Sequence, residues 1–182
     1  TAAVVPLALW VLDCLLVGRS MRAATRSLAG WLLLALPIAV VARVAQTEEL
    51  VDFITPLWTR PLLLADALGF YLFKLVFPVR LAIDYGRSAQ WVLQEGWRDF
   101  FWLIPCVVAI LLWFGRQRRS WLIAAAALFV IGILPVSGLS LFAFQNISDV
   151  ADRYLYFSML GPALALASFL SEPRGKTILA AT

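Results

Sequence analysis

The stretch LAGWLLLALPIAVVARVA, residues 28–45, decides the fold class of this chain. It is close to the roughly 20 mainly apolar residues that a helix needs to cross the hydrocarbon core of a bilayer. Its one charge, Arg43, lies near the end, where a long basic side chain can reach the headgroups. Pro37 predicts a kink inside the helix. We therefore predict a membrane-spanning helix over Leu28–Ala45.

The composition of the whole chain favours the same class. Of its 182 residues, 63% are hydrophobic and 14% are charged, whereas a soluble domain is roughly half apolar and about a quarter charged. The single core of a domain of this size could not hide so much apolar surface from water. We predict an all-α polytopic membrane helix bundle that forms one transmembrane domain over residues 1–182.

Five apolar runs are predicted to span the membrane. They are Ala2–Val17, Leu28–Ala45, Phe100–Phe114, Trp121–Val136 and Tyr154–Leu170. A sixth segment, Pro61–Phe77, is long enough to cross but carries Asp66 and Lys74, and we predict an interfacial or re-entrant helix there. The chain enters an apolar run directly after Thr1, so we expect a fragment of a longer protein.

The distribution of basic residues predicts the topology. Gly18–Ser27, Gly115–Ser120 and the tail after Leu170 carry an excess of Arg and Lys, which places all three in the cytoplasm. The polar stretches Arg80–Asp99 and Ser140–Arg153 then lie together on the outer face. If Pro61–Phe77 spans instead, the arginines of Gly115–Ser120 lie outside, but the two polar stretches still share one side.

The sharpest local feature is SDVADRYLY, residues 148–156. Ser148 is the predicted N-cap of the last helix, and the two acids suit the positive end of the helix dipole. At about 100° per residue, Asp149, Asp152, Arg153 and Tyr156 would share one helix face. Charge at a membrane boundary indicates a site, and an arginine can hold a phosphate by forked hydrogen bonds. The alternative is an Asp149–Arg153 ion pair with ordinary capping.

The second feature is FPVRLAIDYGR, residues 77–87. Pro78 ends the preceding helix, and Gly86 permits a turn. Asp84 could accept hydrogen bonds from sugar hydroxyls, or it could pair with Arg80 or Arg87.

Two charges fall inside the apolar segment that precedes this turn. Asp66 and Lys74 are costly there unless they are paired or solvated. We expect Lys74 to contact a lipid headgroup or to snorkel to the interface.

The chain has no His and only two Cys, which excludes a His base, a His metal site and a disulfide framework.

In this order, the motifs resemble the C-terminal part of the transmembrane region of polytopic C-type glycosyltransferases (GT-C). The closest likeness is to protein O-mannosyltransferase-like proteins that are joined to tetratricopeptide repeats, and to their bacterial relatives. The matching pieces are AVVPLAL (3–9), LD (12–13) with the basic loop after it, GFYLFKLVFP (69–78), LAIDYG (81–86), LPVSGL (134–139) and DVADRYLY (149–156) followed by Gly161.

The resemblance implies transfer of a sugar from a polyprenyl-phosphate carrier to an acceptor such as a protein, on the periplasmic side of a bacterial inner membrane or on a luminal side. A lipid-linked phosphate needs a cationic contact at membrane depth, and Arg153, Lys74, Arg80 and Arg87 could supply it; we predict the first three as ligands of the donor phosphate. We predict contacts with the sugar or the acceptor from Asp84, Tyr85, Asp152 and Tyr156.

The same resemblance implies what this stretch lacks. Such enzymes carry their catalytic acid and any divalent metal in a first outer loop, which this stretch does not contain. We expect no catalytic residue, metal site or cofactor within the chain. As partners we expect membrane lipid and the polyprenyl-phosphate sugar donor, and no nucleic acid. Two other readings stay open: a piece of a transporter or flippase that binds an anionic lipid, and a non-catalytic membrane anchor of a repeat protein.

Overall fold

The computed structural model describes residues 4–45, 55–115, 120–137 and 148–171, and every regular element in these ranges is a helix. The α-helices are α1 (Val5–Leu15), α2 (Met21–Val44), α3 (Arg60–Val76), α4 (Ala89–Gln94), α5 (Leu103–Gly115), α6 (Ser120–Ile133), α7 (Leu155–Ser158) and α8 (Leu160–Ser171). Short 3-10 turns are η3 (Leu57–Thr59), η4 (Gly96–Asp99), η5 (Leu134–Val136) and η7 (Asp152–Tyr154). The all-α prediction is confirmed for this part of the chain.

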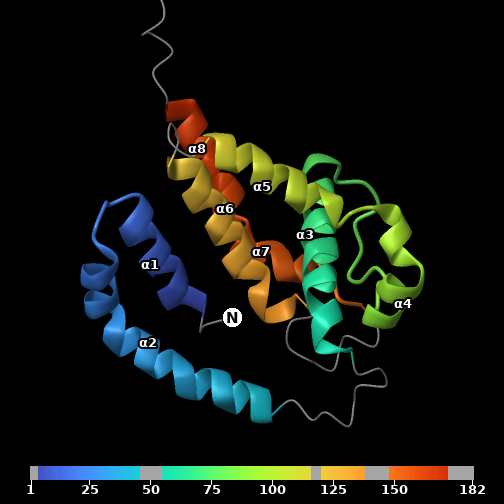
Figure 1. Cartoon of the computed structure of the whole chain (residues 1–182), viewed down its shortest axis with the longest axis horizontal. Coiled ribbons are helices and arrows are strands. Elements are labelled where there is room, and N and C mark those ends of the chain that lie inside the picture. The colour runs from blue at the N-terminus through green and yellow to red at the C-terminus, as the bar shows by residue number, and fades with distance from the viewer. Residues whose placement is uncertain (1–3, 46–54, 116–119, 138–147, 172–182) are drawn as a thin grey trace, which may run out of the picture.

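Helix α6 lies at the centre of the arrangement (Figure 1). On one side it packs against α1 through a cluster that includes Val11 and Ile131. On the other side it packs against α3 through a second cluster that includes Tyr71 and Ile133, and Val150 belongs to the same cluster. Helix α2 lies at the edge and packs against α1. The core therefore joins helices that are far apart in the sequence.

Three glycines let the backbones approach closely. A Cβ added at Gly69 would lie 1.8 Å from the backbone oxygen of Phe101, which lies just before the start of α5. At Gly132 it would lie 2.5 Å from the Oγ atom of Ser158, and at Gly161 it would lie 2.3 Å from the oxygen of Ala125. Small residues at helix crossings are typical of packing in membranes, where no hydrophobic force drives helices together.

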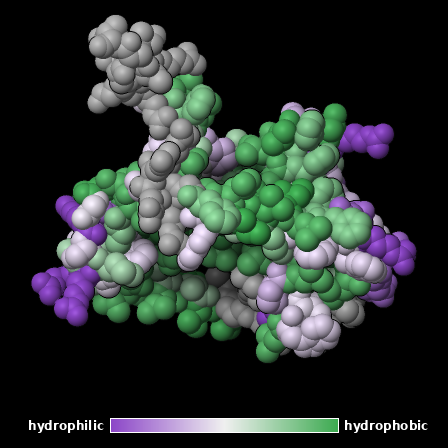
Figure 2. All heavy atoms as spheres, turned by 45° about the horizontal axis from the view of Figure 1, so that its top comes forward, coloured by the Kyte–Doolittle hydropathy of each residue, from purple (hydrophilic) through white to green (hydrophobic). Residues whose placement is uncertain are grey.

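One helix in the described ranges is long and apolar enough to cross a membrane, Met21–Val41, and 6% of its most apolar window is buried inside the protein. The segments Asp152–Ser158 and Leu160–Ser171 pass the same test together but are bent by 48°. The apolar helices over Val5–Leu15, Leu103–Phe114 and Ser120–Val136 are shorter. Figure 2 shows a broad hydrophobic surface with the most hydrophilic residues toward its edges. Five crossings stay a prediction.

The start of the second predicted helix is wrong. We placed it at Leu28, after a basic loop, but α2 begins at Met21. Ser20 is its N-cap, and the Ser20 hydroxyl accepts a hydrogen bond from the backbone N–H of Ala23 at 3.3 Å. A capping serine in front of good helix formers favours the start of a helix. Most of the predicted loop is therefore the first part of α2.

The last predicted helix, Tyr154–Leu170, is not continuous. It is divided into η7, α7 and α8, with the 48° bend between α7 and α8. Pro162 explains the break, because a proline has no N–H for the carbonyl of Ser158 and its ring clashes with that carbonyl. In the first turn of a new helix, where Pro162 lies, the missing N–H is not needed.

The contact at Gly69 gives a test of the fold. We expect Gly69→Ala to lower the free energy of unfolding by roughly 1–3 kcal/mol or more, because the added methyl group meets backbone atoms that cannot move aside. Gly30 on α2 is the matched control: nothing lies within 4 Å of a Cβ added there, so Gly30→Ala should stabilise the helix by up to about 1 kcal/mol. Thermal unfolding midpoints in one detergent measure both, and equal midpoints would contradict the packing of α3 on Phe101.

Candidate functional site

Helix α3 and residues 77–88 fold back on each other as a hairpin, which we call the α3 hairpin (Figure 1). Contacts hold its two arms together at three levels. Asp66 pairs with Arg87, the rings of Phe70 and Tyr85 lie 4.8 Å apart, and Lys74 bonds to carbonyls near the turn. The helix ends where Phe77 leaves the helical region, directly before Pro78.

Arg87 is the centre of a buried ion cluster. Its Nη2 atom donates to both carboxylate oxygens of Asp66, at 2.9 and 3.0 Å, and its Nη1 atom donates to Oδ2 of Asp99 at 2.8 Å. The side chains of Arg87 and Asp66 are only 8% and 3% exposed, whereas that of Asp99 is 43% exposed. The expectation that Asp66 needs a partner in this apolar helix is confirmed.

Aromatic rings enclose the same guanidinium. Its carbon lies 5.4 Å from the ring centroid of Phe70, 4.8 Å from that of Trp91 and 5.1 Å from that of Phe101. A planar guanidinium suits such stacking better than an ammonium would. The alternative prediction that Asp84 pairs with Arg80 or Arg87 is wrong: Arg87 is engaged by the two other aspartates, and no ion pair joins Asp84 to Arg80, both of which the structure describes.

The segment that precedes η7 docks on the α3 hairpin through main-chain hydrogen bonds. The N–H of Asp149 donates to the carbonyl of Arg87 at 2.7 Å. The hydroxyl of Tyr71 accepts from the N–H of Ala151 at 2.9 Å and donates to the Ala151 carbonyl at 3.2 Å. The two polar stretches that the sequence placed on one side therefore contact each other.

Tyr85 makes a side-chain hydrogen bond between these two stretches. Its hydroxyl donates to Oδ1 of Asp152 at 2.7 Å and accepts from the N–H of Ala82 at 3.2 Å. The ammonium of Lys74 lies 4.7 Å from the centroid of the Tyr85 ring. Three of the predicted site residues, Lys74, Tyr85 and Asp152, are thus brought together. Partial burial, and after it the hydrogen bond to Asp152, raises the pKa of Tyr85.

Lys74 is engaged within the protein, because its Nζ atom turns back and donates to the carbonyls of Val79 and Arg80. The expected contact with a headgroup, or snorkelling to the interface, stays a prediction. Arg80 itself has a positive φ of 52° and an exposed side chain. A positive φ is uncommon for a residue with a Cβ atom and needs support from its surroundings. Lys74 supplies part of that support.

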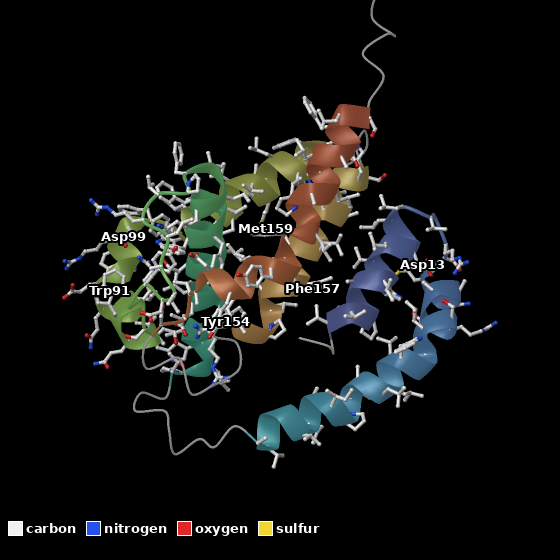
Figure 3. All side chains as sticks on the ribbon, turned by 180° about the vertical axis from the view of Figure 1, so that it is seen from behind. Asp13, Trp91, Asp99, Tyr154, Phe157 and Met159 are labelled. Atoms are coloured by element: carbon white, nitrogen blue, oxygen red, sulfur yellow. The ribbon has the colours of Figure 1, made fainter. Side chains whose placement is uncertain are left out.

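Arg153 and Tyr156 lie apart from the Tyr85–Asp152 contact and line a pocket with a volume of about 510 Å³. It is lined by Gly132, Val136, Arg153, Tyr154, Tyr156, Phe157 and Leu160. The guanidinium of Arg153 stacks on the Tyr154 ring at 4.9 Å, and Tyr156 is 81% exposed. Figure 3 shows Phe157 on the side of α7 toward α1, in agreement with its packing against the cluster that includes Val11. Lys74 and Arg80 do not line this pocket, so the three predicted phosphate ligands do not meet in it.

Two details predicted for residues 148–156 are wrong. Ser148 is not a helix N-cap, because its hydroxyl bonds to the N–H and the carbonyl of Val150, and η7 begins after Ala151. Asp149 does not share a helix face with Arg153 and Tyr156, because it precedes the first helical turn and is buried. Tyr71 and Arg87 draw this segment against α3 in a non-helical conformation.

The sequence reasoning missed Tyr71 and Asp99. Tyr71 looked like one more aromatic residue of an apolar helix, and only the fold shows that its hydroxyl fixes Ala151. Asp99 gave no signal of its own. The one available signal was Asp66, since a carboxylate in an apolar helix requires a basic partner elsewhere. In the described ranges no group of three or more His, Cys, Asp or Glu residues could hold a metal ion.

No protein-family model matches the sequence, and neither the curated proteins nor the solved structures contain a match. The likeness to GT-C enzymes therefore rests on the motifs quoted above.

The ion cluster makes a graded prediction. We expect Asp66→Ala to cost about 3–5 kcal/mol of unfolding free energy, because it leaves a buried guanidinium without its main partner. Asp99→Ala should cost less, because that side chain is 43% exposed and water can replace it. Asp84→Ala, at an exposed position outside the cluster, is the control. Thermal midpoints measured in one detergent rank the three variants, and equal losses for Asp66 and Asp99 would contradict the cluster.

The Tyr85–Asp152 hydrogen bond makes a prediction about pH. Because the pKa of Tyr85 is raised in the folded protein, the stability that the neutral phenol contributes is complete below pH about 10 and is lost as the pH rises through the raised pKa. The phenolate absorbance of the protein minus that of Tyr85→Phe isolates the titration of Tyr85. We expect Asp152→Asn to move this titration to lower pH, whereas Asp84→Asn should leave it in place. An unmoved titration in Asp152→Asn would contradict the contact.

Proposed function

We propose that this chain is the donor-side part of a membrane glycosyltransferase that uses a polyprenyl-phosphate-linked sugar, with a protein hydroxyl as its acceptor. The observation that carries the proposal is the hydrogen bond between Tyr85 and Asp152. It joins the two motifs, LAIDYG and DVADRYLY, whose ordered occurrence resembles the GT-C pattern. Residues that a common site requires are close together although 67 positions separate them.

The Arg153 pocket supplies the contact for a lipid phosphate. An amphiphile with an anionic head needs apolar walls beside a cationic group, and here Val136, Phe157 and Leu160 lie beside one guanidinium. A guanidinium can bind two phosphate oxygens at once. The stacking of Arg153 on Tyr154 restricts its orientation and so lowers the entropy lost on binding.

Asp152 and Tyr85 supply acceptors and donors suited to sugar hydroxyls. Oδ1 of Asp152 receives the Tyr85 hydroxyl, and a carboxylate has room for further donors. Asp152 and Arg153 are neighbours in the chain, so a sugar and its phosphate could reach both groups from one ligand. Asp84 and Tyr156 are exposed, and we keep them as contacts for the sugar or the acceptor.

The membrane placement belongs to the same proposal. Helix α2 would cross the inner membrane of a bacterium, with Arg22 and Arg26 of its first turns at the cytoplasmic side. The Tyr85–Asp152 contact would then face the periplasm. The catalytic acid and any divalent metal would come from an outer loop that this stretch does not contain.

A flippase is the second candidate, because the Arg153 pocket would suit an anionic lipid in transit as well as a sugar donor. Transport moves the whole lipid between leaflets, whereas transfer releases the lipid phosphate from the sugar. The two functions therefore differ in their products. A purely anchoring role predicts that Asp84 and Arg153 can be replaced without effect on either.

The test uses the full-length protein in proteoliposomes with a radiolabelled polyprenyl-phosphate sugar. We expect Arg153→Ala to reduce transfer at least about tenfold, since a hydrogen bond to a charged group contributes about 1.5–3 kcal/mol. Arg98→Ala is the matched control, because Arg98 is also exposed and stacked on its neighbour Trp97 but does not line the pocket. Wild-type transfer by well-expressed Arg153→Ala protein would contradict the donor site, and lipid translocation without transfer would favour the flippase.

A further inference from the structure

The turn of the α3 hairpin presents apolar side chains outward. We call residues 76–83 the apolar tip. Its large hydrophobic side chains are all more than half exposed: Val76 67%, Phe77 56%, Val79 60%, Leu81 62% and Ile83 79%. Contiguous apolar surface of this kind marks a contact with another apolar phase or with a partner. Most of these residues lie outside helices, in the turn that follows α3.

The backbone of the apolar tip is partly satisfied from within. The N–H of Val79 donates to the carbonyl of Phe77 at 2.8 Å, and the N–H of Ala82 donates to the hydroxyl of Tyr85 at 3.2 Å. The ammonium of Lys74 takes up the carbonyls of Val79 and Arg80. Irregular backbone can approach the apolar part of a bilayer only when such groups have partners. In water, hydrogen bonds from Lys74 to two loop carbonyls would add little stability, because solvent can donate to the same carbonyls.

The one charged side chain of the apolar tip is Arg80. It is exposed, it lies between Val79 and Leu81, and its positive φ is supported by the Lys74 contact. A guanidinium on a long stem can hold a lipid phosphate while its apolar neighbours enter the acyl region. A protein partner would need both an apolar and an anionic surface at this spot, whereas a bilayer interface offers both together.

We propose that the apolar tip inserts into the lipid bilayer at the boundary between headgroups and acyl chains, with Arg80 on a phospholipid phosphate. The proposal needs the chain to lie in a membrane but does not depend on sugar transfer. It gives α3 the character of a re-entrant hairpin, with the Tyr85–Asp152 contact held next to the membrane surface. This placement assigns Arg80 to bulk lipid and leaves the donor phosphate to Arg153.

The test uses the full-length protein, with its native cysteines replaced, in nanodiscs. A single cysteine at Ile83→Cys carries an environment-sensitive fluorophore, and two quenchers are compared: brominated acyl chains in the lipid and iodide in the buffer. Leu34→Cys on α2 is the control for hydrocarbon, since Leu34 is 61% exposed. Gln90→Cys on α4 is the control for water, since Gln90 is exposed beyond the hairpin.

We expect quenching at Ile83 by brominated lipid to approach that at Leu34, and quenching by iodide to be several-fold weaker than at Gln90. Strong iodide quenching at Ile83 would overturn the proposal. Protection from both quenchers would mean that protein covers the tip, which also overturns it. If Leu34 escapes brominated lipid, the membrane placement itself is wrong and the proposal fails with it. Loss of sugar transfer alone would affect only the proposed function.

A second measurement isolates Arg80. We expect brominated anionic phosphatidylglycerol to quench the Ile83 fluorophore about twofold more than brominated phosphatidylcholine does. Arg80→Gln should bring that ratio to about one, because it removes the cation and keeps a polar side chain. Arg98→Gln, at another exposed arginine, is the control and should leave the ratio unchanged. A ratio that Arg80→Gln does not alter would overturn the phosphate contact.

Discussion

The arrangement of the candidate site depends on one guanidinium buried between two carboxylates. Removing Arg87 and Asp66 from water carries a desolvation cost of several kcal/mol for each ion, and only good geometry can offset it. Here Asp66 receives two hydrogen bonds, Asp99 receives a third, and three rings close the space around the guanidinium. Such a cluster tolerates little displacement of its members. It therefore fixes the second arm of the α3 hairpin against the first.

The position of that second arm decides where the segment before η7 lies. The carbonyl of Arg87 receives the N–H of Asp149, and Tyr71 of the opposite arm holds Ala151 from the other side. Asp152 follows directly and meets Tyr85. A single chain of contacts thus runs from the ion cluster to the candidate site. The helix break at Pro162 lies at the other end of α7. Because of this break, α7 can continue the direction of this segment while α8 packs along α6 through Gly161.

Apolar runs predicted where the helices lie, because hydrophobic length is a local property of the sequence. The same local reasoning placed Met21–Ser27 in a loop, since it weighed the charge of Arg22 and Arg26 above the capping by Ser20. It also treated residues 148–156 as helical throughout, which the long-range pull of Tyr71 and Arg87 prevents. Partners were the harder part. Asp66 in an apolar helix indicated that a cation must pair with it, but three arginines of the following segments were candidates. Only the fold of the α3 hairpin shows that the partner is Arg87.

Tyr85 connects two opposite charges that never touch. Its hydroxyl donates to the carboxylate of Asp152, and its ring lies under the ammonium of Lys74. A phenol that donates to an anion becomes richer in electron density, which strengthens its attraction for a cation over the ring. Lys74 in turn holds the carbonyls of the apolar tip. A ligand hydroxyl that replaced Tyr85 on Asp152 would therefore weaken the attraction between the Tyr85 ring and Lys74, the residue that also bonds to the apolar tip.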